Sequence, residues 1–94
     1  MISNGIEIIE TNYRCRMGEI DIIGRDDDTL IFFEVKYRKS DAYGNALYAI
    51  DIKKQAKIRK VAQFYLNYSK HKGYVRFDAV GITGDKIDWI RNAF

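Results

Sequence analysis

The predicted fold depends on two short stretches, Gly18-Glu19-Ile20-Asp21-Ile22-Ile23 and Phe33-Glu34-Val35-Lys36. Both alternate polar with β-branched or aromatic side chains, which is typical of half-buried β-strands. Three consecutive aspartates at 26–28 lie between the stretches and favour a tight turn. The sequence therefore predicts a β-hairpin with one charged face and one apolar face.

The register of this hairpin follows from its apolar pattern. If the turn is centred between Asp27 and Asp28, the numbers of opposed residues sum to 55. A slip of one residue would put Asp21 opposite an apolar residue and Glu34 on the other face. In the register whose opposed numbers sum to 55, the charged face pairs Asp21 with Glu34 and Glu19 with Lys36. The apolar face pairs Ile20 with Val35 and Ile22 with Phe33.

The opposed carboxylates of Asp21 and Glu34 need compensation in this register. Their Cβ atoms would lie about 5 Å apart, where two unit charges repel by about 3 kcal/mol at an effective dielectric constant of about 20. A divalent cation would neutralise the pair, and oxygen ligands suit Mg²⁺ or Mn²⁺ better than zinc. The alternative is an exposed hairpin in which water screens the charges and Lys36 pairs with Glu19.

The remaining elements extend this hairpin to a single domain spanning residues 1–94. We expect an α/β fold with a mixed β-sheet in β-β-β-α-β-β order, and a loop at 40–45. Asp51 is the expected N-cap of the helix and Gly73 its expected stop, for a helix of about 18–20 residues. The expected strands are Ile6–Arg14, Glu19–Arg25, Thr29–Tyr37, Tyr74–Thr83 and Lys86–Ala93, and the apolar face of the helix is expected at Ile58, Val61, Ala62, Tyr65 and Leu66.

The net charge of +3 is concentrated on the predicted helix. Residues 51–72 hold seven lysines and arginines against one aspartate, a charge of +6, whereas the other 72 residues sum to −3. Lys53, Lys57 and Lys60 share the face opposite the apolar one. This asymmetry indicates a basic element that approaches a polyanion, or else an ordinary solvated helix face.

The composition excludes several classes of site. One cysteine, Cys15, and one histidine, His71, permit neither an internal disulfide nor a zinc finger, and they argue against Ser-His-Asp or Cys-His catalysis. No apolar run approaches the roughly 20 residues of a membrane span, and the N-terminus lacks the layout of a signal peptide. We therefore expect a cytoplasmic protein whose chemistry uses carboxylates, lysines or a hard metal ion.

Four further side chains have more than one reading. Arg76 and Asp78 share one strand face, where they form a structural ion pair or point towards the carboxylate pair. Tyr65 and Tyr68 are expected to pack in or beside the core, with base stacking as the alternative.

The stretches Gly18-Glu19-Ile20-Asp21-Ile22-Ile23 and Phe33-Glu34-Val35-Lys36 resemble the PD-(D/E)xK nuclease superfamily, whose fold is restriction-endonuclease-like or Holliday junction resolvase-like. The chain resembles the YraN family of bacterial proteins more closely, over essentially its whole length. The residues that carry this second resemblance are Asn12-Tyr13-Arg14-Cys15-Arg16, the two stretches, the lysine-rich helix, Arg76-Phe77-Asp78 and Ala93-Phe94.

The resemblance implies a metal-dependent endonuclease that binds and cleaves DNA, in branched or structured forms. Asp21, Glu34 and the carbonyl group of Val35 would bind Mg²⁺ or Mn²⁺, Lys36 would orient the attacking water, and Glu19 would be an additional ligand or a partner of Lys36. DNA is favoured over RNA, and the residues expected to contact it are Arg14, Arg16, Lys53, Lys54, Lys57 and Lys60. Two alternatives stay open: a nucleic-acid-binding module without catalytic activity, and a protein-interaction domain.

Members of this family begin with an additional helix of about 25 residues, whereas this sequence starts with Met1-Ile2-Ser3-Asn4-Gly5 at the turn into the first strand. The expected core therefore lacks the usual first helix. Because an uncovered apolar sheet face is hidden by a second chain in many proteins, we expect a homodimer.

Overall fold

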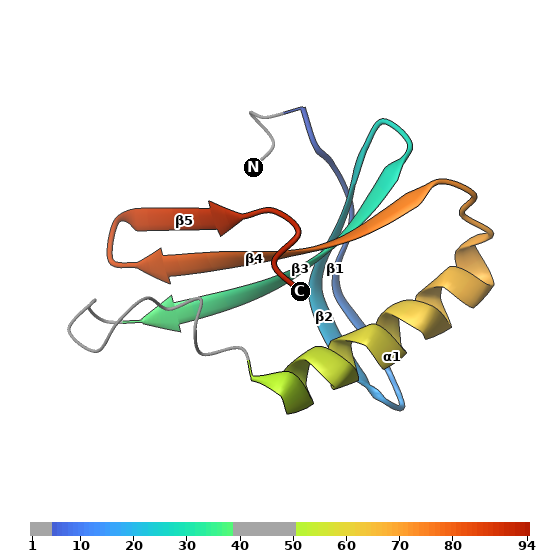
Figure 1. Ribbon diagram of the computed structural model, residues 1–94, viewed down its shortest axis with the longest axis horizontal. Coiled ribbons are helices and arrows are strands. Elements are labelled where there is room, and N and C mark those ends of the chain that lie inside the picture. The colour runs from blue at the N-terminus through green and yellow to red at the C-terminus, as the bar shows by residue number, and fades with distance from the viewer. Residues whose placement is uncertain (1–4, 39–50) are drawn as a thin grey trace.

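The structure is a computed structural model that describes residues 5–38 and 51–94. Five strands form one mixed sheet in the order β1-β2-β3-β4-β5, and one helix lies along one face of it (Figure 1). Neighbouring strands are antiparallel except β3 and β4, which are parallel and joined through the helix. The elements are β1 (Glu7–Cys15), β2 (Gly18–Asp26), β3 (Thr29–Arg38), α1 (Ile52–Ser69), β4 (Tyr74–Thr83) and β5 (Lys86–Ile90).

The mixed α/β fold and its element order confirm the prediction. The expected loop at 40–45 lies outside the described residues. Within those residues, no helix is long and apolar enough to cross a bilayer.

The predicted register of the β2–β3 hairpin is confirmed from Ile22 to Asp26, whereas the predicted pairs beyond Ile22 are not formed. Ile22 lies opposite Phe33, Ile23 opposite Phe32, and Asp26 opposite Thr29, so every opposed pair sums to 55. The pairing of α-carbons ends at Ile22 and Phe33, before it reaches Asp21. Beyond that point the Asp21 side chain takes the place of a backbone partner, because its Oδ2 accepts a hydrogen bond of 2.8 Å from the amide of Val35.

The two faces of the sheet carry separate clusters of buried side chains. The cluster between the sheet and α1 contains Ile20, Ile23, Leu30, Phe32, Ile58, Val61 and Ala62, and the cluster on the other face contains Ile6, Ile31, Phe33 and Val80. The expected apolar face of α1 is confirmed by Ile58, Val61 and Ala62, and Tyr65 packs against the same cluster.

The prediction that Ile20 shares a face with Ile22 is wrong. Ile20 lies under α1, whereas Ile22 packs against the cluster on the other face. The alternation breaks at an irregularity between β1 and β2, where neither Asn12 nor Asp21 has a paired α-carbon and Asn12 has a positive φ of 52°. This irregularity allows Asp21 to line a hollow under α1.

The helix begins as predicted and its 18 residues match the predicted length, but the residue that ends it differs from the prediction. Asp51 caps its N-terminus by accepting a hydrogen bond of 2.8 Å from the amide of Lys54. Lys70, in the left-handed conformation at φ 56°, ends the helix, so Gly73 is not its stop. Gly73 is needed for a different reason, because a Cβ there would overlap with the carbonyl oxygen of Asp28, which accepts a hydrogen bond from the Tyr74 amide.

The last strand is shorter than the predicted Lys86–Ala93. β5 ends at Ile90 because the backbone turns at Asn92, where φ is 53°. The Asn92 amide donates to a carboxylate oxygen of Asp78, and the Ala93 amide donates to the carbonyl of Phe77. These bonds return the C-terminal residues to the sheet.

Candidate functional site

Asp21 of β2 and Glu34 of β3 lie together on the face of the sheet that α1 covers. Glu34 is buried, with 4% of its surface exposed, and Asp21 lines a hollow beside it. Val35, the residue after Glu34, contacts the pair through its backbone. Its amide donates a hydrogen bond to Asp21, while its side chain packs on the opposite face of the sheet. The structure therefore brings together the two carboxylates that the register predicted.

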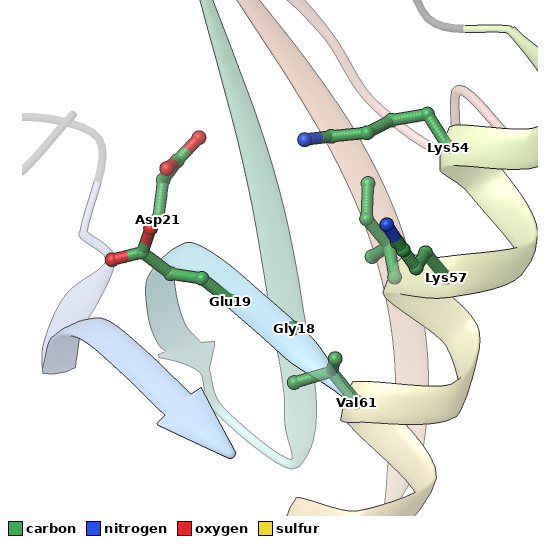
Figure 2. A pocket seen from close by; sticks show the side chains of 7 residues that line it. Gly18, Glu19, Asp21, Lys54, Lys57 and Val61 are labelled. Atoms are coloured by element: carbon green, nitrogen blue, oxygen red, sulfur yellow. The ribbon is translucent and has the colours of Figure 1, made fainter. Parts of the chain in front are cut away.

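The hollow beside the pair has a volume of about 160 Å³ (Figure 2). At Gly18 the strand comes very close to α1. A Cβ at this position would lie 3.3 Å from the Val61 side chain, so glycine allows the close approach at this end of the hollow. Such a volume has room for an ion with bound water. The lining residues are Gly18, Glu19, Asp21, Lys54, Lys57, Ile58 and Val61.

Lys54 contacts the acidic pair formed by Asp21 and Glu34, whereas the sequence predicts for Lys54 only a contact with nucleic acid. Its Nζ lies 3.3 Å from Oε2 of Glu34, and 43% of its side chain is exposed. Figure 2 shows the side chain reaching from the first turn of α1 across the hollow towards Asp21. No spacing in the sequence could have indicated this contact, because it depends on how α1 crosses the sheet.

The pKa of Glu34 is raised from 4.5 to about 7. Burial is the largest cause, followed by the hydrogen bond with Asp21 and the charge of Asp21. Lys54 lowers the pKa of Glu34 but offsets only part of this increase. At neutral pH the acidic pair therefore holds a proton in a substantial fraction of molecules, and a bound cation would compete with that proton.

The donors at the pair fit a hard divalent cation. Across residues 5–38 and 51–94, no three His, Cys, Asp or Glu side chains gather closely enough to form a complete metal cage. Two carboxylates with backbone and water oxygens nevertheless match what Mg²⁺ usually takes from a protein, since this ion retains several of its waters. The chemistry of the pair thus suits Mg²⁺ or Mn²⁺.

Glu19 and Lys36 do not form the predicted pair. Glu19 accepts a hydrogen bond of 3.1 Å from the side chain of Arg14 on β1, because the Glu19 and Arg14 α-carbons are opposed. Glu19 still lines the hollow. Lys36 follows Glu34 by two residues on β3 and so projects from the same face, but in the described part of the chain no ion pair joins it to another residue.

The predicted nucleic-acid-binding residues gather around α1 and the β1–β2 turn. A groove of about 510 Å³ is lined by Asp51, Lys53, Lys54, Ala56, Lys57 and Lys60, and it meets the hollow at Lys54 and Lys57. A second groove of about 600 Å³ is lined by Arg14, Cys15, Arg16, Met17 and Phe64. A basic surface therefore borders the acidic pair.

Arg76 and Asp78 form the predicted structural ion pair. The Arg76 side chain donates two hydrogen bonds, of 2.9 and 3.0 Å, to the fully buried Asp78 carboxylate. Asp78 does not point towards the acidic pair, because it accepts a hydrogen bond from Trp89, which packs with the cluster on the face away from α1. This network, completed by the Asn92 amide, holds the β4–β5 end of the sheet and is separate from the site.

Comparison with other proteins identifies the family. The model of the Uncharacterised protein family UPF0102 matches residues 1–82. A UPF0102 protein of Nitrosomonas europaea is 47% identical over 92 residues, which cover 95% of this chain and 78% of that protein. A UPF0102 protein of Caldicellulosiruptor bescii is 45% identical over 102 residues, which cover all of this chain and 86% of that protein. These matches confirm the expected relationship to the YraN family, and the chain belongs to the Uncharacterised protein family UPF0102.

Proposed function

We propose that this protein is a metal-dependent endonuclease with a PD-(D/E)xK, restriction-endonuclease-like core that binds and cleaves DNA. One observation carries the proposal: two neighbouring carboxylates, the buried Glu34 and the half-buried Asp21, lie beside a hollow whose other wall is a basic helix. Metal-assisted phosphodiester hydrolysis uses a divalent cation close to groups that hold an anionic phosphate. A cytoplasmic location belongs to the same proposal, because DNA is the substrate.

Each residue of the site has a part in this proposal. Asp21, Glu34 and the Val35 carbonyl would bind Mg²⁺ or Mn²⁺, with Glu19 near enough to the hollow to bind one of the ion's waters. When bound, the ion would supply Lewis-acid stabilisation of the phosphate and a water of lowered pKa. Lys36 would orient the attacking water from its position on β3.

Lys54 links the acidic pair to the substrate. In the structure its ammonium group neutralises part of the charge on Glu34. A cation bound by Glu34 would remove that attraction, and Lys54 would then be available to a phosphate oxygen. Lys57 faces the same hollow and would hold the neighbouring phosphate.

One observation favours the second candidate, a nucleic-acid-binding module without cleavage. The charge of Lys54 and the proton that Glu34 retains near neutral pH both reduce the repulsion between the two carboxylates. The acidic pair is therefore compensated without any metal ion. In that case the basic surface would bind DNA while the carboxylates serve only the fold.

We also propose that the protein forms a homodimer. Within the described residues, β5 is an edge strand, and the side chains of Ile87 and Ile90 on it are 65% and 43% exposed. Exposed apolar side chains beside a free strand edge favour pairing with another chain. Sedimentation equilibrium at tens of micromolar should show a dimer, and a stable monomer there would refute this part of the proposal.

Cleavage of labelled DNA separates the two candidates. Junction, flap, single-stranded and duplex substrates would be incubated with the protein in Mg²⁺ or Mn²⁺. We expect Asp21→Asn, Glu34→Gln and Lys36→Ala to reduce cleavage by at least about 100-fold. Asp85→Asn, in the exposed β4–β5 turn, is the matched control and should cleave normally. Equal cleavage by all four variants would identify a contaminating nuclease, and no cleavage by the wild type would favour the binding module.

A further inference from the structure

One outer stripe of α1 changes from basic to aromatic along its length. Its members recur every three or four residues and so lie on the same side of the helix. Lysines occupy the N-terminal half and aromatic rings the C-terminal half. The stripe consists of Lys53, Lys57, Lys60, Phe64 and Tyr68.

The two aromatic residues of this stripe are not explained by core packing. Tyr68 is 72% exposed and Phe64 is half-buried, and neither belongs to the cluster beneath α1 in the described part of the chain. Their ring centroids lie 5.2 Å apart at an interplanar angle of 57°. Tyr65, by contrast, packs on the cluster and meets Tyr13 edge to face. The helix thus presents a pair of rings to solvent as well as a ring to the core.

Cationic side chains lie beside Phe64 and along the N-terminal half of the stripe. Phe64 lines the same groove as Arg14 and Arg16, which come from the β1–β2 turn. The lysines of the stripe line the other groove, which meets the hollow beside the acidic pair at Lys57. At a rise of 1.5 Å per residue, Phe64 and Tyr68 lie about 10 and 16 Å along the helix axis from Lys57.

Aromatic rings beside a basic groove are the features by which proteins bind single-stranded nucleic acid. Phosphates lie against the cations, and unpaired bases stack on the rings. Bases in a duplex already stack on one another and do not offer their faces to a side chain.

We propose that the outer stripe of α1 and the β1–β2 turn bind an unpaired stretch of DNA, with its bases on Phe64 and Tyr68. The substrate is therefore DNA with a single-stranded segment next to the acidic pair. This assignment of substrate class rests on the proposed function, whereas the binding itself needs neither cleavage nor a metal ion.

Binding of a short oligothymidylate, measured by fluorescence anisotropy in EDTA, tests the proposal. A strand of equal length without bases serves as the second ligand, because it keeps the phosphates. Phe64→Leu retains the half-buried apolar volume without the ring, and Tyr68→Ala removes an exposed ring. Tyr74→Ala is the matched control, since Tyr74 is also 72% exposed but lies at the start of β4.

We expect Phe64→Leu and Tyr68→Ala each to weaken binding of oligothymidylate by about 5-fold or more. Both should bind the base-free strand within about 2-fold of the wild type, and Tyr74→Ala should match the wild type on both ligands. The proposal would be overturned if the ring substitutions weakened binding of oligothymidylate and of the base-free strand equally, or left binding of oligothymidylate unchanged. Tighter binding of duplex than of single strand by the wild type, or equally tight binding of polyglutamate, would also overturn it.

The outcomes also separate this inference from the proposed function. Ring-dependent binding without cleavage would support the inference and refute the endonuclease. Cleavage that is insensitive to both ring substitutions would support the endonuclease and refute the inference.

Discussion

Replacing Glu34 by glutamine should change how the stability of the protein depends on pH. Glu34 is buried, and its pKa rises from 4.5 to about 7 because of that burial and of the adjacent Asp21. The folded protein therefore holds a proton on Glu34 between pH 4.5 and 7, whereas the unfolded chain releases it. The associated stability is fully present below pH 4.5 and is lost as the pH rises through 7.

The size of this loss follows from the shift in pKa. One pKa unit corresponds to about 1.4 kcal/mol, so the full shift corresponds to about 3 kcal/mol. Between pH 5 and pH 8 the expected decrease in the free energy of unfolding is about 2 to 3 kcal/mol. Little of this is reduced by solvent screening, because only 5% of the Glu34 side chain is exposed.

Urea unfolding between pH 5 and 8, followed by the fluorescence of Trp89, measures the effect. The difference in unfolding free energy between Glu34→Gln and the wild type should increase by about 2 to 3 kcal/mol over this range, in favour of the variant. Glu7→Gln is the control, because Glu7 makes an exposed ion pair with Arg25 and its loss should change stability by less than about 1 kcal/mol at every pH. Parallel curves for Glu34→Gln and the wild type would refute the reasoning.

Three further substitutions test other parts of the structure. Lys54→Met removes the cation that lowers the pKa of Glu34, so the pH midpoint of the stability change should rise, and an unchanged midpoint would contradict the ion pair. Gly73→Ala should destabilise the protein by about 1 to 3 kcal/mol in urea unfolding, because its Cβ would overlap with the Asp28 carbonyl, and wild-type stability would refute this contact. Asp78→Asn should cost about 3 to 5 kcal/mol in the same assay, because it leaves a part-buried guanidinium without its anion, and a loss below 1 kcal/mol would contradict the network.

The sequence predicts the hairpin well because its information there is local. The apolar residues of β2 and β3 fix which side chains are opposed, and the observed pairing of Ile22 with Phe33 follows from that pattern. The position of Ile20 could not be predicted, because the break in alternation lies at an irregular pairing with the neighbouring strand, where Asn12 has a positive φ. Asparagine adopts a positive φ more often than most residues, but hydrophobic periodicity does not indicate where in a strand it does so.

The candidate site is likewise predictable only where a single hairpin determines it. Asp21 and Glu34 come together one residue beyond the last paired α-carbons of two adjacent strands, so extending the register by one residue indicates the pair. The contact of Lys54 with Glu34 depends on how a helix 20 residues further along the chain crosses the sheet. The sequence does not indicate the role of Gly73 either, because its close approach to Asp28 joins two distant turns.

Mn²⁺ binding, followed by electron paramagnetic resonance, tests most directly whether Asp21 and Glu34 form a cation site. At about pH 8, where most Glu34 carboxyls have lost their proton, the wild type should bind one Mn²⁺ per chain. Asp21→Asn and Glu34→Gln should each abolish this binding, whereas Asp85→Asn should retain it. Equal binding by all four proteins, or no binding by the wild type, would contradict the account.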